Sequence, residues 1–165
     1  MIHKKHSVIW TFFYYIVYIT AQLTWGCIQS LVGFVFFLIF YKQPHDWYHG
    51  SIRTKWKTMN GISLGLFIFV PDENEPNLLR ASPTQPSILK ERCDRISVHE
   101  YGHTIQSLIL GPLYLFTVGF VSLAWSRLNR YKQLRKQYGV PYSFCWPEQW
   151  ADYLGETLLK RPALR

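Results

Sequence analysis

The sequence has few charged residues and few cysteines. Only 17% of its 165 residues are Asp, Glu, Lys or Arg, whereas about a quarter are charged in an average soluble domain. The three cysteines, Cys27, Cys93 and Cys145, are odd in number and form no CxxC pair. This argues against a disulfide framework and favours a reducing environment such as a cytosolic face.

The charges that are present give a net charge of +8 and cluster beside apolar runs. Lys4 and Lys5 precede the first run, Lys42 follows it, and the cations between 127 and 136 follow the last one. Such clusters fit the positive-inside rule and an attraction to anionic lipid. Because no nucleic-acid-binding module accompanies them, we predict a lipid bilayer as partner and no nucleic acid.

The first 41 residues predict an apolar helical hairpin. Residues 8–41 contain no formal charge, a stretch too long for one bilayer crossing of about 20 residues and short for two. Gln22, Gln29 and the pair Trp25-Gly26 interrupt it. We therefore predict helices over 8–24 and 27–41.

Residues 42–86 predict an insertion of strand and loop. Residues 42–60 are polar, aromatic and basic, and we expect them to be irregular. Residues 61–70 are apolar and predict a short β segment, whose glycines allow close backbone approach. Residues 71–86 contain four prolines and predict a loop.

Residues 87–165 predict the catalytic region. A helix is expected from Ser87 to Gly111-Pro112, then a basic helix over 127–139 and a final helix over about 147–159. Between them, residues 113–125 could form about 20 Å of helix, too short for a bilayer of about 30 Å. We expect a re-entrant apolar hairpin that places the site near one membrane face. The predicted fold class is a mostly α, small helical integral-membrane protein, with residues 1–165 forming a single domain.

A zinc motif lies on the long helix. His99 and His103 are four residues apart, so a helix places both imidazoles on one face, where they can hold two positions of a tetrahedral zinc ion. Glu100, beside the first histidine, can take the proton of a metal-bound water as it attacks a carbonyl. Gly102 would let another segment pack close to the metal.

Catalytic zinc usually keeps three protein ligands, and Glu148 is the predicted third. Pro147 suits the first turn of a helix that would present Glu148 to the metal. Asp152, one turn later, could accept the second ring N–H of His99 and fix its tautomer. An alternative pair, His45 and His49, is also spaced by four.

Other residues are candidates for substrate binding or oxyanion stabilisation. Tyr114, Tyr138 or Tyr142 could donate a hydrogen bond to an oxyanion. Asn60, with residues 61–64, could bind a substrate backbone as an added strand.

The pattern His99-Glu100-x-x-His103 followed by Glu148-x-x-x-Asp152 resembles the gluzincin branch of the zincin metallopeptidases. The resemblance implies that His99, His103 and Glu148 bind zinc, that Glu100 is base and then proton donor, and that Asp152 orients His99. It covers two short segments, and the apolar flanks depart from the soluble family. The segment from His99 to Tyr114 also resembles small bacterial membrane proteins of unassigned function.

These observations predict a zinc-dependent metalloprotease that hydrolyses a peptide bond at or within the membrane. Its substrate would be a membrane-associated peptide or protein, and its site would lie near the cytoplasmic face of a bacterial inner membrane. Three alternatives remain open. The protein could be a zinc-dependent lipid amide or ester hydrolase, or a membrane adaptor with a structural HExxH. It could also be an intramembrane protease that resembles site-two proteases, with Asp152 as the third zinc ligand. Substrate identity and oligomeric state stay open.

Overall fold

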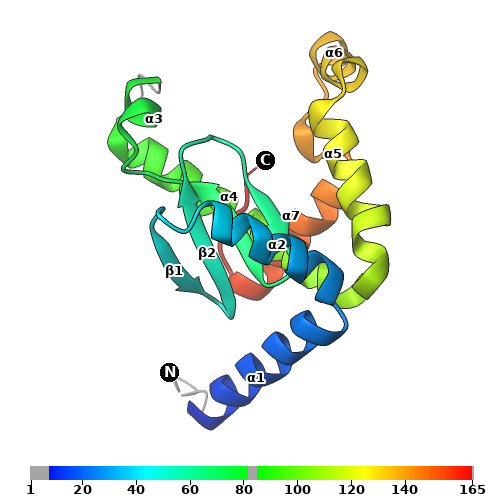
Figure 1. Ribbon diagram of the computed structural model, residues 1–165. Coiled ribbons are helices and arrows are strands. Elements are labelled where there is room, and N and C mark those ends of the chain that lie inside the picture. The colour runs from blue at the N-terminus through cyan, green and yellow to red at the C-terminus, as the bar shows by residue number, and fades with distance from the viewer. Residues whose placement is uncertain (1–7, 82–84, 165) are drawn as a thin grey trace, which may run out of the picture.

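Helices surround a small sheet in the computed structural model, which describes residues 8–81 and 85–164 (Figure 1). The two predicted helices of the amino-terminal hairpin are α1 (Val8–Thr24) and α2 (Cys27–Ile39). The break between them lies at Trp25-Gly26, as the sequence predicts, and bends the pair by 93°. In the described part of the chain, no single helix is both long and apolar enough to cross a membrane.

Residues 42–71 form a four-stranded sheet in the order β1-β2-β4-β3. The strands are β1 (His45–Tyr48), β2 (Ser51–Trp56), β3 (Ile62–Leu64) and β4 (Phe67–Pro71). β1 and β3 pair antiparallel to their neighbours, and β2 pairs parallel to β4.

The prediction of irregular structure over 42–60 is therefore wrong. His49 and Gly50 both have positive φ, the signature of a tight hairpin turn between β1 and β2. Arg53 and Asp46 face each other across the strands and make a bidentate ion pair, so their charges satisfy one another within the sheet. The β segment predicted over 61–70 is present, but Gly65 turns it into two strands, β3 and β4.

The core lies on both faces of β4, all of whose residues are buried. Phe67 and Phe69 pack against the phenylalanines of α2. Because side chains alternate along a strand, Ile68 and Val70 point to the other face, where α4 (Pro86–Leu110) packs. In Figure 1, α2 lies in front of the sheet and α4 behind it.

The chain after α4 bends sharply. α4 begins one residue before the predicted start and ends at Leu110, just before Gly111, whose φ is +53°. A single 3₁₀ turn, a π-helical segment (Leu115–Gly119) and α5 (Phe120–Arg127) follow, bent by 113° from α4. The basic helix α6 (Asn129–Tyr138) comes next. The predicted loop over 71–86 contains a short helix, α3 (Pro76–Ala81).

The last helix, α7 (Trp146–Leu159), packs closely against α4 because two glycines lie at the crossing. A Cβ on Gly102 would lie 1.9 Å from the carbonyl oxygen of Ala151. A Cβ on Gly155 would lie 2.2 Å from the carbonyl oxygen of Val98. The expectation that Gly102 admits a neighbouring segment is confirmed, and the segment is α7.

Candidate metal centre

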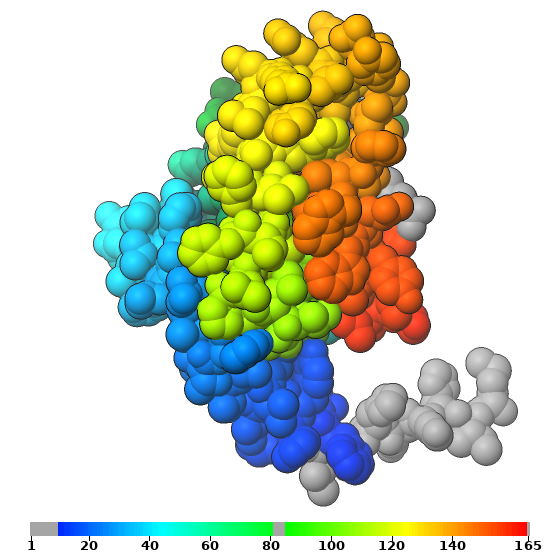
Figure 2. Space-filling model, turned by 90° about the vertical axis from the view of Figure 1, so that its right-hand side faces the viewer, coloured from blue at the N-terminus to red at the C-terminus, as the bar shows by residue number. Residues whose placement is uncertain are grey.

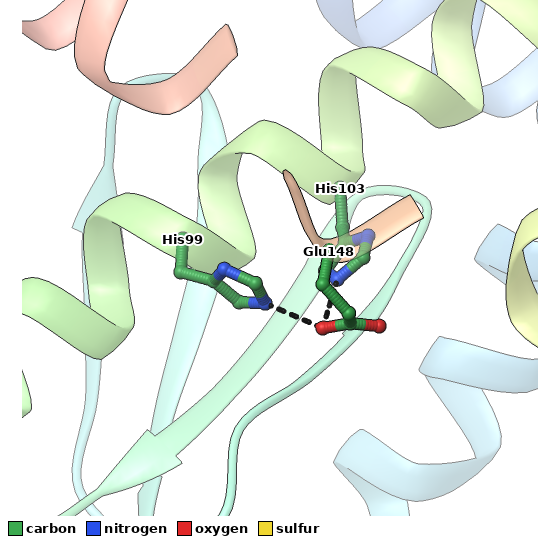
Figure 3. Close-up of side chains that lie close together, drawn as sticks. All are labelled: His99, His103 and Glu148. Carbon is green, nitrogen blue, oxygen red and sulfur yellow. Dashed lines mark hydrogen bonds and ion pairs between the residues drawn. The ribbon is translucent and has the colours of Figure 1, made fainter. Parts of the chain in front are cut away.

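The HExxH motif lies in the buried middle of α4. His99, Glu100 and His103 are all at most 8% exposed, and the two imidazole rings lie one turn apart with their centroids 4.8 Å from each other. The α7 side of the site is supplied by Glu148, which is 1% exposed. Figure 3 shows both imidazoles pointing toward the Glu148 carboxylate.

The donor atoms converge at distances that suit a metal. Oε2 of Glu148 lies 3.1 Å from Nε2 of His99 and 3.6 Å from Nε2 of His103. Ligands of a tetrahedral zinc ion at about 2.0–2.1 Å are separated from one another by roughly 3.3 Å. Among the described residues, these three are the only group of histidine, cysteine or acidic side chains placed to share one metal ion.

Each imidazole is held at Nδ1 by a further side chain, and its Nε2 faces the Glu148 carboxylate. His99 donates from Nδ1 to Oδ1 of Asp152 at 2.7 Å, as the sequence predicts. His103 donates from Nδ1 to Oε1 of Gln106 at 2.6 Å, and Gln106 in turn donates from Nε2 to the carbonyl of Pro147 at 2.7 Å. Partners of this kind orient metal ligands and raise their basicity.

Gln106 is a site residue that the sequence analysis missed. It lies three residues after His103 and is fully buried in the uncharged end of α4 that follows the motif. A buried amide needs a hydrogen-bond partner, but the sequence alone does not show that Gln106 is buried. Because Gln106 links His103 to the residue before Glu148, it also fixes α7 relative to α4.

The electrostatics of the cluster follow from burial and pairing. Burial alone would lower the pKa of His99, but its hydrogen bonds to Asp152 and Glu148 raise it above the usual histidine value. Burial would raise the pKa of Glu148, yet the hydrogen bonds from His103 and His99 lower it. Burial raises the pKa of Glu100, against the opposing effect of the two histidines.

The donor set fits a divalent cation. Oε1 of Glu148 and Oδ2 of Asp152 are buried with no hydrogen-bond partner within the described residues, and a buried carboxylate is costly unless it is compensated. Two imidazole nitrogens and a carboxylate oxygen can together bind a metal ion. Asp152 contacts His99 and lies outside the ligand group, so it takes the orienting position rather than that of a third ligand.

The strand β3 begins beside Glu100. A Cβ on Gly61, the residue before β3, would lie 2.1 Å from Oε1 of Glu100. Tyr114 is 3% exposed and donates from its hydroxyl to the carbonyl of Ser63 at 3.3 Å. Burial, with the charges of Glu100 and Glu148, raises the pKa of Tyr114, so its hydroxyl stays protonated.

The other candidate residues, which are Tyr142, Tyr138 and Asn60, are not part of the group formed by His99, His103 and Glu148. Burial and the charge of Glu148 raise the pKa of Tyr142, which is 40% exposed. Tyr138 lies apart from the cluster, lining a small apolar pocket with Trp125 and other residues of α5 and α6. Asn60 is exposed, and its carbonyl accepts from Nε1 of Trp56.

The alternative histidine pair does not join the site. His45 lies in β1, where its ring contacts Oγ1 of Thr54 at 2.9 Å and the carbonyl of Tyr41 at 3.1 Å. His49 lies in the turn that follows and packs against the Tyr101 ring. A strand and its turn cannot present these histidines on one helical face.

Comparison with known proteins gives no match, since no family model, no characterised protein and no solved structure is similar to this chain.

Proposed function

We propose that the protein is a zinc-dependent metallohydrolase that cleaves a peptide bond at a membrane surface. The observation that carries the proposal is the convergence of two Nε2 atoms on Oε2 of Glu148, with a further buried carboxylate, Glu100, next to His99 on α4. Three protein ligands beside a free carboxylate are typical of catalytic rather than structural zinc sites. The gluzincin resemblance assigns the same roles to the same residues.

Each side chain has a defined task in this proposal. Bound zinc would supply Lewis acidity and a water of lowered pKa. His99, His103 and Glu148 would hold the metal, while Asp152 and Gln106 keep the two imidazoles oriented. The Glu100 carboxylate would accept the water proton and return it to the leaving nitrogen.

The substrate would lie along β3, the edge strand next to Glu100. Gly61 has no side chain, so the backbone just before β3 lies directly against the Glu100 carboxylate, and an extended peptide could add to this edge through main-chain hydrogen bonds. Tyr114, which already lies at the Ser63 carbonyl, is the tyrosine best placed to donate to an oxyanion. An edge strand favours a peptide over a lipid amide or ester, because only a peptide repeats the backbone groups that such a strand pairs with.

A Glu100→Gln variant tests the proposal against a matched control. Glu91→Gln changes another glutamate of α4, one that is exposed and paired with Arg95. Both variants should keep helix content and zinc, and only Glu100→Gln should lose hydrolysis of fluorogenic peptides in detergent micelles. Equal turnover in the two variants would contradict the proposed base, and hydrolysis of N-acyl amides or esters but not of peptides would favour the lipid alternative.

A further inference from the structure

The first two helices bury both of their glutamines and expose most of their large apolar residues. The buried residues of α2 are Gln29, Ser30 and Gly33, and Gln22 is fully buried in α1. The exposed large residues of the pair are apolar or aromatic: Trp10, Phe12, Phe13, Tyr14, Ile16, Val17, Leu23, Trp25, Ile28, Leu31, Val32, Phe34, Val35, Leu38 and Ile39. This arrangement is the reverse of a helix that faces water.

The buried polar groups form a hydrogen-bonded network against α4. Gln22 donates from Nε2 to the carbonyl of Thr104 at 2.9 Å. Gln29 donates from Nε2 to Oγ of Ser107 at 2.7 Å and to the carbonyl of Gly111 at 3.0 Å. Ser107 donates to Oε1 of Gln22 at 3.0 Å. Polar side chains that bond between helices while apolar ones face outward are typical of packing in lipid.

The two bends of the chain meet at one point, which we call the apex. It consists of Trp25-Gly26, between α1 and α2, and Gly111, at the end of α4. A Cβ on Gly111 would lie 2.2 Å from the Trp25 indole, so the two bends are in contact. The large residues around the apex are exposed: Leu23, Trp25, Ile28, Ile109, Leu113 and Phe116, the last of them 73% exposed.

Figure 2 shows a face of the molecule on which the end of α1 and the chain from the π-helical segment through α5 lie next to each other, with α7 beside them. The contributing stretches, residues 8–41 and 104–126, contain no charged side chain. The basic helix α6 lies at the end of this face, at the top of Figure 2. Residues 127–136 include five cations and no acid, so the edge of the apolar face is strongly positive.

We propose that this face docks into one leaflet of an anionic phospholipid membrane, with the apex deepest and α6 on the headgroups. The apolar area supplies the hydrophobic contact, and α6 supplies the charge complementarity. Gly111 lies eight residues beyond His103 on α4, about 12 Å along the helix axis. An apex within the acyl chains therefore holds the metal site near the headgroup region, within reach of polypeptide that emerges from the bilayer. The docking surface does not depend on the proposed hydrolase activity.

A depth measurement tests the apex. Cys27, exposed at the bend, is kept as a single cysteine in a Cys93→Ala, Cys145→Ser background and labelled with bimane. The control protein has the same background with Cys27→Ser added, and its single cysteine is Asn77→Cys, at an exposed position on α3. In vesicles of phosphatidylcholine and phosphatidylglycerol, mid-chain doxyl lipids should quench the Cys27 probe and leave the Asn77→Cys probe unquenched. Equal quenching of the two probes, or none at Cys27, would overturn the proposal.

Two further measurements address the lipid partner. Replacing Arg130 and Lys132, both exposed, with glutamine should weaken binding to the anionic vesicles by about 25-fold, because each cation near the surface contributes about a factor of five. The control Lys57→Gln should have little effect. Equal binding to vesicles of phosphatidylcholine alone and to the anionic vesicles would contradict the role of α6. Disulfide cross-linking of Cys27 between two chains in vesicles would show that a second copy covers the apex, and would overturn the lipid assignment.

Discussion

The close crossing of α4 and α7 gives a sharp prediction for Gly102→Ala. An alanine in a helix interior is ordinarily more favourable than glycine by about 0.8–1 kcal/mol. At Gly102, however, the new methyl group would lie 1.9 Å from the carbonyl oxygen of Ala151, a backbone atom that no side-chain rotation can move. The added carbon must therefore push the two helices apart.

The size of the expected loss in zinc affinity follows from contact distances. An ordinary carbon–oxygen contact needs a separation of at least 3.4 Å, so α7 must shift by roughly 1.5 Å to remove the overlap. Metal–ligand bonds tolerate about 0.2 Å. The shift would carry Glu148 out of reach and pull Asp152 from His99. Because loss of an orienting partner alone costs 10- to 100-fold in affinity, we expect zinc affinity to fall by at least about 100-fold.

Competition with a chromophoric chelator would measure zinc affinity in detergent, and far-ultraviolet circular dichroism would confirm helix content. Gly119→Ala is the matched control, since its nearest neighbour would lie at 3.4 Å, and it should bind zinc as the wild type does. A Gly102→Ala protein that is folded and binds zinc with wild-type affinity would refute the account of the α4–α7 crossing.

Substitutions at three other positions test the site and the sheet. Asp152→Asn removes the charge behind His99 and should weaken zinc binding by about 10-fold, with no change if Asp152 is only a packing residue. Gln106→Leu removes the acceptor for His103 and should lower zinc affinity 10- to 100-fold. Gln106→Glu keeps that acceptor and should lower zinc affinity less. The pKa of Asp46 is lowered: burial opposes its ionisation, but the bidentate bonds from Arg53 outweigh that effect. A carboxyl group whose pKa is lower in the folded state stabilises the fold at any pH above its unfolded-state pKa of about 3.9. This stabilisation is lost as the pH falls through the folded-state pKa. Asp46→Asn should therefore lower thermal stability at neutral pH, by about 1 kcal/mol or less because Asp46 is partly exposed. The difference should shrink as the solution is acidified, and a gap in stability that does not change with pH would contradict this account.

Local patterns in the sequence account for most of the helices and for the centre of the site. The uncharged run broken at Trp25-Gly26 predicts α1 and α2, and Gly111-Pro112 predicts the end of α4. The pairing of Glu148 with a motif 45 residues earlier could be predicted because metal chemistry demands a third ligand and Pro147 marks a helix start.

The parts that could not be predicted depend on contacts between distant residues. β1 and β2 are rich in polar and charged side chains, and only their pairing shows that Asp46 and Arg53 neutralise each other. Gln106 has no local pattern that separates an orienting amide from a packed one. The proximity of Gly61 to Glu100 depends on how the sheet lies against α4, which no periodicity in the sequence encodes.

The most direct test of the central claim is the zinc content of detergent-purified protein, measured by elemental analysis in the wild type, His103→Ala, Glu148→Gln and the control Glu91→Gln. The site predicts one zinc ion per chain in the wild type and the control, and zinc lost or strongly weakened in the other two. Full zinc in Glu148→Gln would place the third ligand elsewhere. No zinc in the wild type, even after reconstitution, would contradict the metal centre and the hydrolase proposed from it.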